Sequence, residues 1–169
     1  MRAIFHGFVL VLLAACYPDL DWREVRSDEG GFSVLLPTKP RIDSQSIPAQ
    51  GYPLQLHQWS SKARQTAFAI GYADLPRPGS DALTVMREAL LRNISGKVIS
   101  DDPVVINGIP GRDILAEGRI GNSDVVLRLR SLSGQGRLYQ LAILGPPGDF
   151  QTSETETFFL SFRLDKANP

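Results

Sequence analysis

The sequence predicts an α+β domain built from antiparallel strands and two helices. Its 169 residues are 43% hydrophobic and 21% charged, the balance of an ordinary globular protein, and that length corresponds to one domain. Several short segments alternate apolar and polar residues with period two, as half-buried strands do. Because these segments follow one another with only two helical patterns between them, we expect an antiparallel sheet covered by the helices.

The strand patterns run along most of the chain. They lie in residues 32–36, 41–49, 52–60, 65–73, 97–119, 122–132 and 136–145. Asn107 and Gly108 interrupt the segment 97–119 and indicate a hairpin, since both residues accept a positive φ. The segment 136–145 is apolar on both faces, which is typical of a central strand. In 65–73 one face carries only small residues, which favours the close approach of a helix.

Two segments carry helix signatures. After the capping residues Ser80 and Asp81, apolar residues recur at helical spacing, and Gly96 is the predicted terminator. The second helix follows a capping box from Ser153 to Glu156. It carries a heavy apolar load, namely Phe158, Phe159 and Phe162.

The N-terminal segment has the pattern of an export signal. Arg2 is followed by an uncharged apolar stretch that is short for a transmembrane helix and ends in small residues. Residues 13–16, Leu-Ala-Ala-Cys, resemble the lipobox of bacterial lipoproteins. That resemblance implies cleavage between Ala15 and Cys16, lipidation of the Cys16 thiol and palmitate-like acyl chains in a membrane. The alternatives are an ordinary secretory signal with an incidental cysteine, or a buried helix.

These patterns divide the chain into four parts. Residues 1–15 are the predicted signal peptide, 16–22 a lipidated tether, 23–165 a single α+β domain and 166–169 a short tail. The expected location is the bacterial cell envelope, with the domain facing the periplasm. Tyr17 is not the Asp that retains many lipoproteins in the inner membrane, so the outer membrane is slightly favoured.

Composition argues against several classes of function. The formal net charge is zero, whereas nucleic-acid binders carry a basic excess. After export the chain would keep one cysteine and only His57, too few for a zinc site, and we expect no metal, no cofactor and no catalytic residue. We interpret His57 as a strand residue rather than a base. Four acidic residues could suggest a calcium site, but acidic turn residues are the better interpretation: Asp101, Asp102, Asp113 and Glu117.

Three arginines form the candidate surface contact of the domain. Arg128, Arg130 and Arg137 come from the predicted hairpin of 122–132 and 136–145 and could line one sheet face that meets an anionic surface. The alternative is a solvated face with cross-strand charge pairs. Trp22, Trp59 and several tyrosines could rim a ligand groove, although aromatic residues more often belong to the core.

Short motifs of the domain resemble the PsbP/Mog/DcrB-like families. They are Trp22, the segment 30–40, the segment 105–112, the segment 137–141 and the segment 158–163. The resemblance implies an antiparallel sheet flanked by helices in an α/β/α sandwich. It also implies a binding or assembly protein rather than an enzyme. No metal-binding residue of the photosystem members is carried over, because nothing here matches such a motif.

The leading hypothesis is therefore a non-catalytic envelope lipoprotein that is anchored to the membrane by lipid and binds another envelope protein. The alternative is a carrier of a small apolar ligand or lipid, for which we expect an enclosed apolar cavity of at least ~300 Å³. A hydrolase is the third hypothesis and would need carboxylates near His57.

Overall fold

The computed structural model describes residues 20–49, 52–75, 82–134, 136–149 and 152–165. Within these ranges the strands are β1 (Arg23–Ser27), β2 (Phe32–Leu36), β3 (Arg41–Ala49), β4 (Tyr52–Ala63), β5 (Thr66–Asp74), β6 (Lys97–Ile106), β7 (Ile109–Ile120), β8 (Ser123–Gly134), β9 (Arg137–Gly145) and β10 (Arg163–Leu164). The helices are α1 (Ala82–Asn93) and α2 (Thr152–Ser161).

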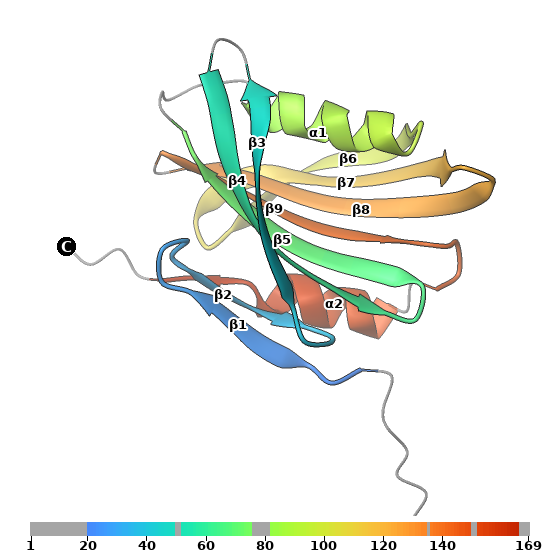
Figure 1. Cartoon of the computed structure of the whole chain (residues 1–169), viewed down its shortest axis with the longest axis horizontal. Coiled ribbons are helices and arrows are strands. Elements are labelled where there is room, and N and C mark those ends of the chain that lie inside the picture. Colours follow the sequence, from blue (N-terminus) through green and yellow to red (C-terminus); the bar gives the residue numbers. More distant parts are fainter. Residues whose placement is uncertain (1–19, 50–51, 76–81, 135, 150–151, 166–169) are drawn as a thin grey trace, which may run out of the picture.

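A large antiparallel sheet forms the body of the domain. Its seven strands lie in the order β3-β4-β5-β9-β8-β7-β6, and a smaller sheet has the order β1-β2-β10. Figure 1 shows α1 above the large sheet, while α2 and the small sheet lie together below it. The two faces of the large sheet are thus covered by different structures.

The prediction of an α/β/α sandwich is wrong. The described residues contain ten strands and only two helices, so the domain is mainly β. The layer opposite α1 is completed by the small sheet, because α2 is only 10 residues long and cannot cover that face alone. The sequence analysis did not predict β1 and β10. Both strands are short, and they pair with β2 from opposite ends of the chain.

Most of the predicted strands are confirmed. Asn107 and Gly108 form the turn between β6 and β7 with φ of 51° and 78°. β9 lies between β5 and β8 and is buried on both faces, as its apolar sequence predicts. A strand in the middle of a sheet carries mostly apolar residues because its two faces are covered by other elements.

The predicted helix ends need two corrections. At the end of α1, Ser95 rather than Gly96 has the left-handed φ, 48°. The amides of Ser95 and Gly96 donate to the carbonyls of Arg92 and Leu91, which is the Schellman pattern. α2 already begins at Thr152, so Ser153 lies inside the first turn instead of capping it.

The core between the large sheet and α2 is solid and aromatic. Phe32, Phe158 and Phe162 are fully buried there, and Phe32 packs edge to face against Trp59 and Tyr139. Phe158 meets Phe68 of β5 with ring centroids 5.5 Å apart. Edge-to-face packing of this kind adds about 0.5–1.5 kcal/mol per pair beyond the burial of area.

Candidate functional site

The face of the large sheet below α1 differs from the aromatic face. β5 alternates, so that Phe68, Ile70 and Tyr72 enter the solid core while Ala67, Ala69 and Gly71 face α1. Opposite Ala69 in the neighbouring strand stands Ala142, and opposite Gly71 stands Gln140. At Ala69 and Ala142 the upper face of the sheet therefore carries only methyl groups.

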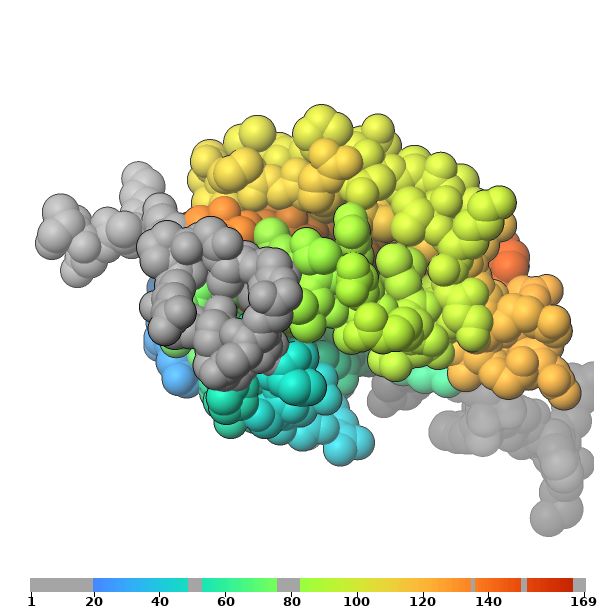
Figure 2. All heavy atoms as spheres, turned by 90° about the horizontal axis from the view of Figure 1, so that it is seen from above, coloured from blue at the N-terminus to red at the C-terminus, as the bar shows by residue number. Residues whose placement is uncertain are grey.

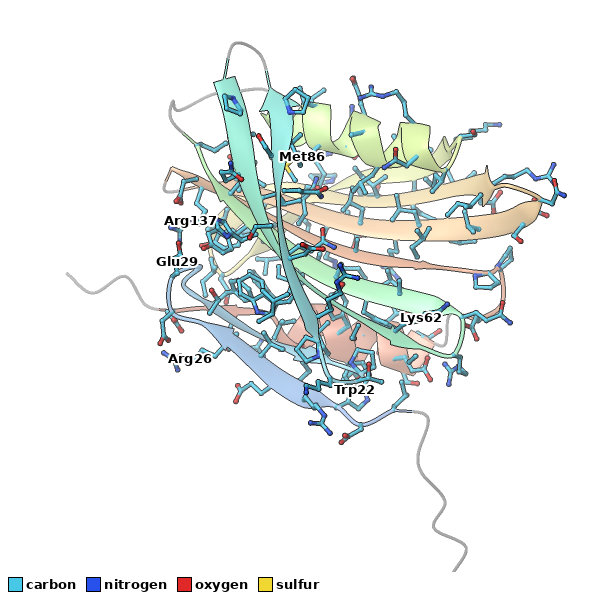
Figure 3. All side chains as sticks on the ribbon, viewed as in Figure 1. Trp22, Arg26, Glu29, Lys62, Met86 and Arg137 are labelled. Carbon is cyan, nitrogen blue, oxygen red and sulfur yellow. The ribbon has the colours of Figure 1, made fainter. Side chains whose placement is uncertain are left out.

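Helix α1 does not descend into the space that these small residues leave. Its first half packs through Met86 on a cluster with Leu56 and Leu138, and its end packs through Ile94 on a second cluster with Ile114. Figure 3 shows Met86 below α1 on the side of the sheet. The expectation that small residues bring the helix close to this strand is therefore wrong. The helix rests on larger side chains at both of its ends.

Gly118 fixes the second of these supports. A Cβ atom at this position of β7 would lie 2.3 Å from the carbonyl oxygen of Ile94, so any other residue would push the helix end away. The amide of Arg119 donates to the same carbonyl. The end of α1 is thereby held against β7, and the middle of the helix spans the small-residue floor.

The result is a groove of about 470 Å³ between α1 and the sheet, which we call the α1 groove. Figure 2 looks onto this face, with α1 in yellow-green between the cyan β3 and β4 and the yellow β6 and β7. The groove is lined by Gln45, Ile47, Leu56, Gln58, Ser60, Ala67, Ala69, Gly71, Met86, Ala89, Leu90, Asn93, Leu127, Gln140, Ala142 and Leu144. Its volume lies within the range of about 300–1,000 Å³ that small-molecule sites occupy.

The lining of the α1 groove carries no charge. None of its residues is acidic or basic, and its polar groups are amides and one hydroxyl. Gln140 lies in the floor, is buried, and donates through Nε2 to Ser131 Oγ at 3.4 Å. An ion in this groove would lose hydration without meeting an opposite charge, whereas an apolar molecule would gain by leaving water.

The three arginines of the predicted surface contact lie on the other face and have different partners. Arg128 and Arg130 share the carboxylate of Asp113, with Nε–Oδ distances of 3.5 and 2.8 Å. The guanidinium of Arg130 also lies over the ring of Phe159, 4.4 Å from its centre. These two arginines thus cover the edge of the aromatic core.

Arg137 lies at a separate place, beside the turn of the small sheet. Its Nε donates to Asp74 at 2.6 Å and its Nη1 donates to the carbonyl of Glu29 at 2.8 Å. Figure 3 shows Arg137 and Glu29 close together at this end of the molecule. Arg137 therefore joins β9 to the small sheet, and a role of the three arginines as one contact surface stays a prediction.

His57 lies on the aromatic side of β4, where its ring stacks on Tyr72 with centroids 5.0 Å apart. Its Nδ1 is 3.1 Å from Ser44 Oγ, the residue directly opposite in β3. Nucleophilic catalysis by such a pair requires a third group that orients the imidazole. Among the described residues, no hydrogen bond reaches the other ring nitrogen of His57.

The remaining sequence predictions are placed as follows. Ala15 and Cys16 lie outside the described residues. Asp101 pairs with Arg87 and Arg112, and Asp113 with Arg128 and Arg130. From Leu20 to Asp165, outside the gaps, no group of three His, Cys, Asp or Glu residues could hold a metal ion. No helix in these ranges has the length and apolar character needed to span a membrane.

The sequence offered one signal of the α1 groove. Ala67, Ala69 and Gly71 alternate with large apolar residues in the printed sequence, and Ala142 does the same in β9. What the sequence could not show is that these two strands are neighbours and that Ala69 stands opposite Ala142.

Comparison with known proteins identifies the fold. No family model matches the chain, and no curated protein matches it. The cyanobacterial PsbP (CyanoP) from Synechocystis sp. PCC 6803 aligns with a TM-score of 0.56 and 9% identity over 92% of this chain and 98% of that one. Protein PA94 of unknown function from Pseudomonas aeruginosa aligns with a TM-score of 0.46 and 16% identity over 79% and 89%. The chain therefore has a PsbP-like fold, as its sequence motifs predict.

Proposed function

We propose that this domain is a non-catalytic binding protein that holds a small, uncharged, apolar molecule in the α1 groove. The observation that carries the proposal is the groove itself: about 470 Å³, floored by Ala69 and Ala142 and lined by no charged residue. A pocket of this size with a few polar groups among apolar ones is the usual form of a small-molecule site. The groove is open rather than the enclosed cavity expected of a carrier, but its volume and uncharged lining support the carrier more than the other functions that the sequence suggests.

The chemistry of the lining narrows the class of ligand. Apolar side chains from both α1 and the sheet suit an alkyl chain or a flat hydrophobic ring. The amide side chains of Gln45, Gln58 and Asn93 can donate to or accept from a hydroxyl, ester or amide group. The expected ligand is therefore an alcohol, ester or similar neutral lipid fragment rather than a fatty acid or a nucleotide.

Binding of the neutral dye Nile red tests this proposal. Dye fluorescence should rise and saturate with the full chain, and Ala69→Leu or Ala142→Leu should weaken binding about tenfold, because about two methylenes of ligand contact are displaced at about 0.8 kcal/mol each. Val105→Leu is the matched control, since Val105 is 70% exposed and does not line the groove. Equal binding by all four proteins would contradict the proposal.

We further propose that lipid on Cys16 anchors the domain to a bacterial envelope membrane. The support is the sequence pattern alone: an apolar stretch that ends in Leu-Ala-Ala-Cys at residues 13–16. The intact mass of the protein from the host's membrane fraction should equal residues 16–169 plus a diacylglyceryl group and one amide-linked acyl chain. An unmodified soluble mass would contradict anchoring. Binding to another envelope protein stays a prediction, which crosslinking in the envelope would test.

A further inference from the structure

A second, charged pocket lies on the other side of α1, towards β6 and β7. Arg87 of α1 and Arg112 of β7 converge there on the carboxylate of Asp101 in β6. Arg87 Nη1 donates to Asp101 Oδ2 at 3.2 Å, and Arg112 Nε donates to Oδ1 at 2.7 Å. Arg112 Nη2 also donates to the carbonyl of Asp101 at 2.6 Å. Both oxygens of the carboxylate are thus engaged.

The charges of this cluster do not balance. Two guanidinium groups share one carboxylate, which leaves one positive charge in excess. The Nε atom of Arg87 is buried and has no hydrogen-bond partner within the described part of the chain. A buried donor without an acceptor is unfavourable by about 1–3 kcal/mol. Because Nε is closed off from solvent, an acceptor from outside the chain would meet it only after the Arg87 side chain turns towards the pocket.

The space beside these groups is small and polar on one side. A pocket of about 160 Å³ is lined by Leu83, Thr84, Arg87, Arg112, Ile114 and Ser131. It is smaller than the sites of whole drug-sized ligands but has room for a single tetrahedral or planar anionic group. Two hydroxyl groups and two guanidinium groups from three different elements therefore surround it.

We propose that this pocket binds an oxyanion, a phosphate or carboxylate group, through Arg87 and Arg112 with the hydroxyls of Thr84 and Ser131 as further donors. The planar fork of a guanidinium matches the oxygen spacing of both groups, and hydrogen bonds between ions are about twice as strong as neutral ones. The inference stands apart from the proposed ligand of the α1 groove, because it rests on other residues.

Two kinds of ligand carry such a group: a free anion, and an amphiphile with an anionic head group. The second kind is connected to the α1 groove by one pair of side chains. Ser131 lines the anion pocket, Gln140 lines the groove, and the two are hydrogen bonded beneath α1. In this second case the α1 groove would hold the apolar part of an anionic amphiphile in place of the neutral ligand proposed above.

NMR titration of the full chain with inorganic phosphate, at constant ionic strength, tests the proposal. The Nε–H signal of Arg87 and the amides of Thr84 and Ser131 should shift and saturate. Arg87→Gln and Arg112→Gln should each weaken binding about tenfold, the loss expected for one hydrogen bond between charged groups. Arg92→Gln is the matched control, since Arg92 lies on the same helix and its ion pair in the described ranges is with Glu88 at the surface, 3.6 Å away.

Titrations with octyl phosphate and octanol distinguish the two kinds of ligand. A free anion predicts equal affinity for phosphate and octyl phosphate, while a head group predicts at least about tenfold tighter binding of octyl phosphate with shifts at Ala69 and Ala142. Either result supports the anion site.

If phosphate leaves the Arg87 Nε–H signal unmoved, or if both glutamine variants bind as the wild type does, the anion site is wrong. Octanol shifts at Ala69 and Ala142 in that case would leave the α1 groove intact.

Discussion

The two faces of the seven-stranded sheet are built from the same strands, but one packs into a closed core and the other lines a groove. On β5 the side chains of Phe68 and Tyr72 enter a closed aromatic core, while Ala69 and Gly71 between them face the open α1 groove. Because successive residues of a strand point to opposite faces, one strand can serve a stabilising core and a binding floor at once. Stability and binding can therefore be changed separately by substitutions one residue apart.

The closed face should carry most of the stability of the domain. Phe158 of α2 is fully buried against Phe68 and Phe159, so Phe158→Ala should lower the free energy of unfolding by about 3–5 kcal/mol through lost burial and a cavity. Urea denaturation measures the loss. Leu160→Ala on the same helix, 62% exposed, should change it by less than about 0.5 kcal/mol. Equal losses at Phe158 and Leu160 would show that α2 is not packed as described.

Enlarging a buried alanine should distinguish the stability of the two faces of the sheet more clearly than truncating a large side chain. Ala63 is 3% exposed in the aromatic core, so Ala63→Leu should destabilise the domain by about 1–3 kcal/mol through overpacking. Ala69→Leu extends a side chain into the α1 groove and should leave the free energy of unfolding within about 1 kcal/mol of the wild type. Thermal and urea unfolding of both variants measure the difference. Destabilisation of the same size at Ala69 would mean that the groove is closed in solution.

The smallest expected change in the free energy of unfolding comes from removing tyrosine hydroxyl groups on the aromatic face of the sheet. Burial raises the pKa of Tyr139 above its ordinary value of 10.0, and the phenol donates to the carbonyl of Gly30 at 2.9 Å. Tyr139→Phe should therefore lower the free energy of unfolding by about 1 kcal/mol at pH 7. Burial also raises the pKa of Tyr72, whose hydroxyl is buried without a hydrogen-bond partner in the described ranges, so Tyr72→Phe should be neutral or stabilising.

The direction of the pH dependence follows from these raised pKa values. The folded chain keeps the phenolic proton of Tyr139 to a higher pH than the unfolded chain does, so its contribution is complete below pH 10 and is lost as the pH rises through the folded pKa. Unfolding measured at pH 9 to 11 should show a steeper loss of stability for the wild type than for Tyr139→Phe. Identical slopes would argue that Tyr139 is accessible to water when the protein is folded.

Local signals predicted the elements of this fold better than their arrangement. The turn at Asn107 and Gly108 and the central position of β9 follow from φ preferences and apolar patterning, which act within a few residues. The pairing of Arg163 with Ser33 joins opposite ends of the chain, and no local pattern encodes it. The layer that α2 shares with the small sheet depends on that pairing.

The binding site was harder to predict for the same reason. The small residues at 67, 69 and 71 are visible in the sequence, but their alternation alone predicted a close helix. The groove exists because Met86 and Ile94 hold α1 on larger side chains at its two ends. The two arginines that meet Asp101 likewise come from α1 and β7, which only the folded chain brings together.

The most direct test of the α1 groove uses alanine methyl groups as reporters. The full chain with labelled alanine methyls would be titrated with decanol, a neutral apolar molecule, and observed by NMR. Ala69, Ala89 and Ala142 line the groove, while Ala63 is buried in the aromatic core on the other face of the sheet. We predict saturable shifts and methyl contacts to decanol at the first three and none at Ala63. Absent shifts at Ala69 and Ala142, or an equal shift at Ala63, would contradict this prediction.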